Sequence, residues 1–182
     1  MTTTPSTPST PTTPAATGHK EEREGREFVV FTRTFRAPID DVWVAVTESD
    51  RLGRWIGTWE GDPAEGQVTF QMRFEGDEAS SEKFQIDVCE PPHRLAITTE
   101  MPYDGVNPQT WQLRVELAER GGVTTLTFAQ DVPEPEMAHS VGPGWDYYLD
   151  RMVVAESGGD PGTLDFDDYY PALADHYKAE FA

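Results

Sequence analysis

Metal-binding chemistry needs side chains at particular spacings, and this chain does not provide them. It contains four histidines, His19, His93, His139 and His176. None belongs to an HxH, HxxxH or HExxH pattern, which would bring two imidazoles to one metal ion. Asp165, Asp167 and Asp168 resemble the start of a calcium loop, but the glycine and the glutamate that complete an EF-hand are absent. We therefore expect no metal site.

Nucleophilic and cofactor chemistry also lack their motifs. No serine or cysteine stands in a nucleophile motif such as G-x-S-x-G, and Gly142-Pro143-Gly144 is typical of a helix entry rather than of a phosphate loop. No dinucleotide-binding fingerprint is present. The sequence therefore predicts no cofactor and identifies no catalytic residue.

General acid–base chemistry requires an ionisable group in apolar surroundings, where its pKa shifts. The candidates on otherwise apolar elements are Asp87, Arg114, Tyr147, Tyr148 and Asp150. Asp87 and Arg114 occupy the polar phase of alternating segments, so we expect them to face solvent. Asp146 and Asp150 share the helix face opposite an apolar stripe, and we expect that face to be solvated too.

Large apolar side chains form the main candidate site. Bulky aromatic residues and methionines from several elements are predicted to converge, and such residues line most small-molecule pockets. The predicted ligand-binding residues are Trp55, Trp59, Phe70, Met72, Phe84, Trp111, Tyr148 and Met152. The alternative interpretation is that these side chains fill an ordinary core.

The apolar periodicity predicts the elements that carry these residues. Alternation with period two predicts strands over residues 27–36, 68–74, 84–88, 95–99, 111–117 and 123–130. Spacing of three and four residues predicts helices over residues 39–46, 52–59, 142–155 and 168–181. Consecutive strands with hairpin turns and few helices favour an α+β fold with an antiparallel sheet. A long helix in the concave face of a curled sheet leaves space between the two.

The N-terminal residues differ in composition from the rest. Residues 1–17 contain eight Thr, four Pro and two Ser, and no apolar residue larger than Met1. Such a segment buries too little surface to offset the entropy of ordering, so residues 1–25 are predicted to be a disordered tail. Residues 26–182 are predicted to form one domain.

Charge and cysteine content restrict the partners and the compartment. The formal net charge is −19 at pH 7, and a strongly negative surface repels phosphate backbones and anionic lipids. We therefore expect neither nucleic acid nor membrane as a partner. The chain has no run of eighteen apolar residues, no signal-peptide core and one cysteine, Cys89, which together predict a cytoplasmic protein.

Two segments resemble a known family. The segment VVFTRTFRAPIDDVWVAVTESDRLGRWIG resembles the start of activator of Hsp90 ATPase homologue 1-like domains, in the START-like, Bet v 1-like (SRPBCC) superfamily. The matching residues are Arg33, Phe35, Ala37, Pro38, Val42, Trp43 and Trp55. GPGWDYYLDRMVVA resembles the closing helix of bacterial members, and the likeness covers residues 26–178.

The resemblance implies a helix-grip fold, in which a curved antiparallel sheet holds a long C-terminal helix around an apolar cavity. It also implies a choice among three functions, because this superfamily includes ligand carriers, polyketide cyclases and Hsp90 co-chaperone modules. We favour binding of a small apolar or aromatic molecule. An enzyme of the cyclase or hydrolase type and a protein-interaction module with an unknown partner are the alternatives.

Overall fold

Eight strands form one antiparallel sheet in the computed structural model, which describes residues 13–74, 81–102 and 108–182. Their order across the sheet is β1-β2-β8-β7-β6-β5-β4-β3. The strands are β1 (His19–Arg23), β2 (Arg26–Phe35), β3 (Gly57–Glu60), β4 (Gln67–Met72), β5 (Ser81–Glu90), β6 (Arg94–Pro102), β7 (Pro108–Arg120) and β8 (Val123–Asp131). All neighbouring strands pair antiparallel. Sequential connections join every pair except β2 and β8, which are distant in the chain.

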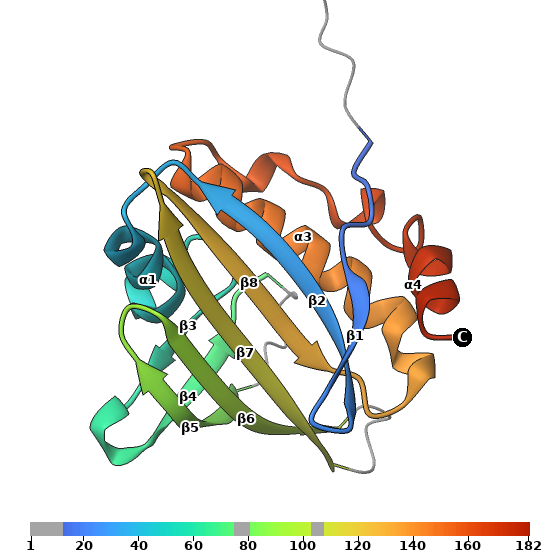
Figure 1. The fold of residues 1–182 in the computed structure, drawn as a ribbon, viewed down its shortest axis with the longest axis horizontal. Coiled ribbons are helices and arrows are strands. Elements are labelled where there is room, and N and C mark those ends of the chain that lie inside the picture. The colour runs from blue at the N-terminus through green and yellow to red at the C-terminus, as the bar shows by residue number, and fades with distance from the viewer. Residues whose placement is uncertain (1–12, 75–80, 103–107) are drawn as a thin grey trace, which may run out of the picture.

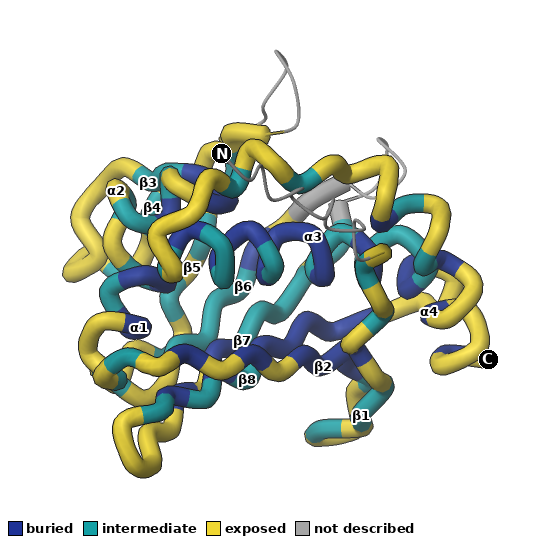
Figure 2. The backbone as a smooth tube through the Cα atoms, turned by 90° about the horizontal axis from the view of Figure 1, so that it is seen from above, coloured by how far each residue is buried: buried dark blue, intermediate teal, exposed yellow. Residues whose placement is uncertain are grey.

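The helices lie on one side of this sheet, with α3 running along its concave face (Figures 1 and 2). The α-helices are α1 (Ile39–Thr47), α2 (Ser49–Leu52), α3 (Ala138–Glu156) and α4 (Ala174–Glu180). Short 3-10 helices span Pro63–Glu65, Pro135–Met137, Pro161–Thr163 and Phe166–Asp168. The predicted α+β helix-grip fold is confirmed: a curved antiparallel sheet packs around a long C-terminal helix.

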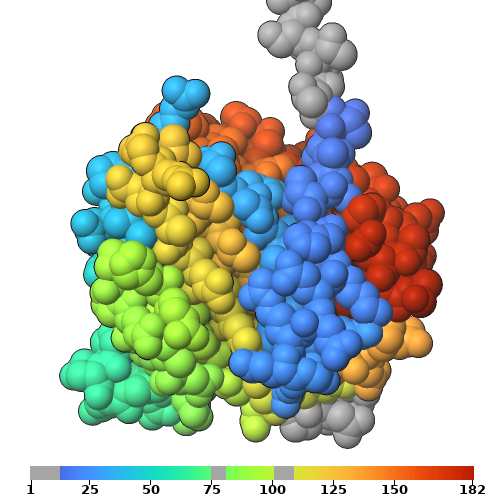
Figure 3. Space-filling view, viewed as in Figure 1, coloured from blue at the N-terminus to red at the C-terminus, as the bar shows by residue number. Residues whose placement is uncertain are grey.

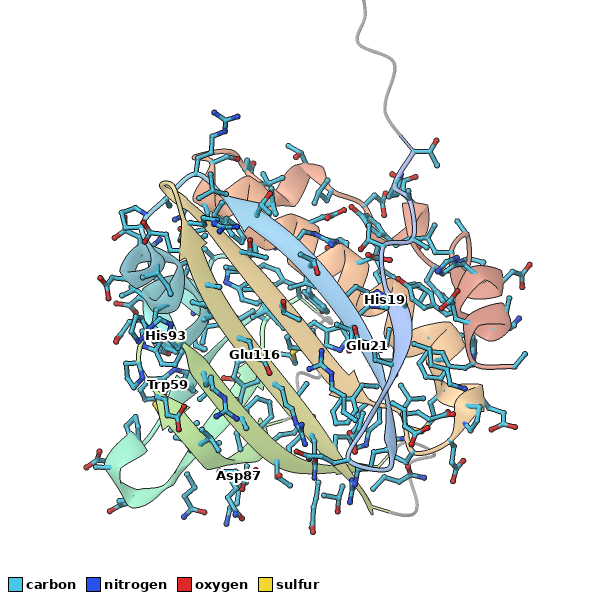
Figure 4. The ribbon with its side chains drawn as sticks, viewed as in Figure 1. His19, Glu21, Trp59, Asp87, His93 and Glu116 are labelled. Atoms are coloured by element: carbon cyan, nitrogen blue, oxygen red, sulfur yellow. The ribbon has the colours of Figure 1, made fainter. Side chains whose placement is uncertain are left out.

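The period-two pattern of β2 explains how the sheet separates its two faces. Val29, Phe31 and Phe35 are buried in the main core, toward α3. Phe28 and Val30, on the opposite face, form a small second cluster with Ala129. The outer face is otherwise mainly polar, and in Figure 4 Glu116 lies in front of the sheet while α3 lies behind it. The expectation that Asp87 faces away from the core is correct.

The predicted tail boundary at residue 25 is wrong, because His19–Arg23 forms β1 at the edge of the sheet. This strand is polar, and its order comes from backbone pairing with β2. The Gly18 amide also donates to the Tyr177 hydroxyl at 3.0 Å, and the N-terminal segment lies against α4 (Figure 3). Counting apolar residues does not predict such hydrogen bonds, because backbone groups pair regardless of the side chains beside them. Residues 1–12 lie outside the described residues.

Three of the predicted helices differ in the structure. The one predicted over residues 142–155 begins four residues earlier, at Ala138, so Gly142-Pro143-Gly144 lies inside α3 and not at its entry. The helix predicted over residues 52–59 is wrong, because α2 ends at Leu52 and turns follow it. Trp59 belongs to β3, where it pairs with Phe70. The one predicted over residues 168–181 begins only at Ala174. Pro171 accounts for this late start, because the residue before a proline is disfavoured in helical conformation.

A β-bulge in β5 changes which side chains face inward. The register with β6 shifts between Ile86 and Val88, so that one extra residue is accommodated on β5. Val88 therefore joins Asp87 on the outer face, contrary to the simple alternation of the sequence. Cys89 takes the inward position instead. A bulge reverses the facing of every later residue in a strand, because side chains alternate with period two.

Candidate functional site

An apolar cavity of about 570 Å³ lies between the concave face of the sheet, α1, α2 and α3. Its volume falls within the range of about 300–1,000 Å³ that small-molecule sites occupy. β4 to β8 supply one wall, and the N-terminal half of α3 supplies the opposite one. The expected space between sheet and helix therefore exists, and apolar side chains dominate its surface.

All five tryptophans of the chain line this cavity: Trp43, Trp55, Trp59, Trp111 and Trp145. Three of the indole nitrogens are bonded to the surrounding walls. Trp55 Nε1 donates to the Ala45 carbonyl at 3.0 Å, and Trp59 Nε1 donates to the Thr47 carbonyl at 2.8 Å. Trp145 Nε1 donates to Gln130 Oε1. These bonds hold the three rings in place, so that aromatic surface is presented to the cavity in fixed orientations.

The structure brings together seven of the eight residues predicted to bind a ligand. The cavity-lining ones are Trp55, Trp59, Phe70, Met72, Phe84, Trp111 and Tyr148. Met152 is not among the lining residues, because it lies one turn beyond Tyr148 on α3 and is completely buried in the core. Phe70 and Phe84 stack on neighbouring strands, with ring centroids 4.8 Å apart.

Sequence reasoning did not identify the polar residues of the cavity wall. Thr99 and Gln130 line it and are 1% and 2% exposed. Thr99 Oγ1 and Gln130 Nε2 are buried without a hydrogen-bond partner in the structure. The alternation of the strands could have identified them, because residues two apart on a strand share a face. Thr99 therefore lies on the same face of β6 as Ile97, and Gln130 lies on the same face of β8 as Phe128.

The unpaired Thr99 hydroxyl leads to a stability prediction with a matched control. Thr124 is also buried, but its hydroxyl donates to the Ala37 carbonyl at 2.7 Å. Thr99→Val removes an unpaired polar group, so the free energy of unfolding should stay unchanged or rise by about 1 kcal/mol. Thr124→Val removes an existing hydrogen bond and should lower the free energy of unfolding by about 1–2 kcal/mol. Urea unfolding of the ligand-free proteins measures both, and equal losses would contradict the assignment.

The comparison with protein families identifies the chain. The family of activator of Hsp90 ATPase homolog 1-like proteins, AHSA1, matches residues 36–155. This chain belongs to the AHSA1 family. The matched region runs from the end of β2 to the C-terminal part of α3, and so includes the strands and helices around the cavity.

Solved structures share the fold of this AHSA1 chain. CalU16 from Micromonospora echinospora superposes with a TM-score of 0.69 at 23% identity, over 90% of this chain and 95% of CalU16. A protein encoded by BPP1335 of Bordetella parapertussis gives 0.66 at 19% identity, over 99% and 94%. DynU16, described as a putative protein in the dynemicin biosynthetic locus, gives 0.61 at 24% identity, over 74% of this chain and 49% of DynU16. No curated protein matches the chain.

The AHSA1 chain also contains a buried ionic cluster, which lies outside the cavity lining. Asp146 is completely buried, which corrects the expectation that it faces solvent. Arg33 Nη2 lies 3.2 Å from Asp146 Oδ1 and 2.9 Å from Asp150 Oδ1. The helix face opposite the apolar stripe is therefore covered, because β2, α4 and the N-terminal segment pack against it.

Two tyrosine hydroxyls complete the cluster. Tyr177 donates to Asp146, and Tyr169 donates to Asp150 Oδ2 at 2.9 Å. Burial, followed by the neighbouring carboxylate, raises the pKa of each phenol above its ordinary value. Both tyrosines are consequently protonated donors at neutral pH. The cluster ties α4 and the N-terminal segment to α3, which is a structural role.

Proposed function

We propose that this AHSA1 chain binds a small apolar or aromatic molecule in the cavity between the sheet and α3. The observation that carries the proposal is the cavity itself, about 570 Å³ in volume and lined by every tryptophan of the chain. Burial of an apolar ligand against such a surface contributes roughly 25 cal/mol per Å² of apolar area removed from water. DynU16, one of the solved structures with this fold, belongs to a biosynthetic locus, which is compatible with a small-molecule ligand.

The enzyme alternative has less support. An acid–base enzyme needs an ionisable pair in the cavity wall, where burial tunes its pKa. Two carboxylates, Glu48 and Glu82, line the cavity, but Glu48 is exposed and Glu82 is only half-buried. The fully buried pair, Arg33 with Asp146, does not line it. The interaction-module alternative needs a broad exposed apolar patch. Among the described residues, Phe74 and Phe166 are the large apolar side chains that are exposed, at 40% each.

The experiment is titration with N-phenyl-1-naphthylamine, a neutral apolar probe whose fluorescence rises in apolar surroundings. The wild-type protein should bind one probe molecule, with energy transfer from the tryptophans. Leu113→Trp, in the sheet wall of the cavity, should fill the space and weaken binding at least about 10-fold. Gln112→Trp places the same side chain on the outer face of β7 and is the matched control.

The two variants separate specific from nonspecific binding. If Gln112→Trp weakens binding as much as Leu113→Trp does, the probe is not in the cavity. If the wild-type protein binds no probe at all, the proposed function is wrong. Far-ultraviolet circular dichroism of both variants checks that the sheet is preserved.

A further inference from the structure

We propose that the ligand is uncharged and carries a hydrogen-bond acceptor, such as a carbonyl oxygen, that receives a hydrogen bond from Gln130 Nε2. This inference rests on the proposed function and specifies its ligand class. The cavity is therefore not a uniform apolar space, because one end of it requires a polar group of defined type.

The sheet register brings the unpaired polar side chains to the same end of the cavity. Thr99 pairs with Trp111 across β6 and β7, and Leu113 pairs with Gln130 across β7 and β8. Strand geometry therefore separates Thr99 and Gln130 by two strands and two residues, about 12 Å between Cα atoms. This is the end where β8 finishes and where Trp145 of α3 covers the sheet.

The orientation of the Gln130 amide is determined by its neighbour. An indole N–H can only donate, so the oxygen of the amide must face Trp145 Nε1. The amide NH₂ then faces away from Trp145 and has no partner in the structure. Buried polar groups are nearly always hydrogen-bonded, and an unmet donor costs free energy. A ligand acceptor at this position satisfies the group, whereas a ligand donor does not.

The charges of the wall exclude an anionic ligand. Glu48 and Glu82 line the cavity, and none of the lining residues in the described part of the chain is Lys, Arg or His. A carboxylate ligand would enter apolar surroundings without a cation, which is costly. An uncharged acceptor carries no such cost. Free fatty acids are therefore disfavoured relative to ketones, quinones and similar carbonyl compounds.

The test compares three ligands of one shape by displacement of N-phenyl-1-naphthylamine: fluorene, 9-fluorenone and fluorene-9-carboxylate. Wild-type protein should bind 9-fluorenone about 5- to 10-fold more tightly than fluorene, the ratio that one hydrogen bond provides. It should bind the carboxylate at least about 10-fold more weakly than fluorene. Gln130→Met should bring the affinities for fluorenone and fluorene to within about twofold of each other.

Two further variants guard against indirect effects. Gln130→Glu retains an acceptor for Trp145 but removes the amide donor, so it should also lose the preference for fluorenone. Thr99→Val leaves Gln130 intact and should retain that preference. Fluorene is the internal control, because a disrupted cavity would weaken fluorene and fluorenone alike.

The outcomes distinguish this inference from the proposed function. Equal affinity of the wild-type protein for fluorene and fluorenone would overturn the inference while leaving cavity binding intact. Loss of the preference in Thr99→Val but not in Gln130→Met would overturn the assignment to Gln130. Tight binding of the carboxylate would overturn the exclusion of anions. If none of the probes binds, N-phenyl-1-naphthylamine included, both the proposed function and this inference are wrong.

Discussion

Arg33→Met should lower the free energy of unfolding by about 3–5 kcal/mol, because it leaves the fully buried Asp146 carboxylate without its cation. Arg33 also donates to Thr17 Oγ1 at 2.8 Å and to Asp150, so a single substitution breaks contacts to α3 and to the N-terminal segment. Methionine retains much of the apolar stem of the arginine side chain, so the loss of the charge accounts for most of the change in unfolding free energy. Equilibrium urea unfolding, followed by circular dichroism, measures the change.

Arg36→Met is the matched control for this prediction. Arg36 lies three residues further along the chain and is exposed, and its replacement changes the net charge by the same amount. We expect its unfolding free energy to stay within about 0.5 kcal/mol of wild type. A comparable loss in both variants would attribute the effect to overall charge rather than to the buried cluster.

Gly142→Ala should destabilise the protein by about 3 kcal/mol. A Cβ at this position of α3 would overlap the ring of Tyr177, which is completely buried. The ring can move only by giving up its hydrogen bonds with Asp146 and the Gly18 amide, so overpacking and lost contacts act together. Thermal and urea unfolding measure the loss, and limited proteolysis reports whether α4 separates from α3.

Gly144→Ala in the same helix should have the opposite effect. A Cβ at Gly144 meets no atom within 4 Å, so alanine brings only its better helix propensity, about 1 kcal/mol of added stability. The two variants make the same chemical change two residues apart. If Gly144→Ala is as unstable as Gly142→Ala, helix geometry rather than the Tyr177 contact explains the requirement for glycine.

Backbone periodicity made much of the fold predictable. The alternation of Val68, Phe70 and Met72 with polar residues predicts a half-buried strand without knowledge of the strands that pair with it, because side chains on a strand alternate with period two. The spacing of Trp145, Tyr148 and Leu149 likewise specifies a helix face. The same patterns identified most of the aromatic cavity wall, since large apolar residues on inward faces must meet.

Other features depend on contacts between distant segments. Asp146 lies on the polar side of its own helix, and nothing local reveals that Arg33 and Tyr177 will cover it. The β5 bulge that turns Cys89 inward arises from pairing with β6, and β1 is ordered by the edge of β2. The sequence by itself determined the α+β class with its antiparallel sheet and the apolar character of the site, because both follow from periodicity. The helix-grip arrangement came from the resemblance to the family. The tertiary structure decided the ionic cluster and the unpaired Gln130 donor, because a buried polar group is defined by neighbours far away in the chain.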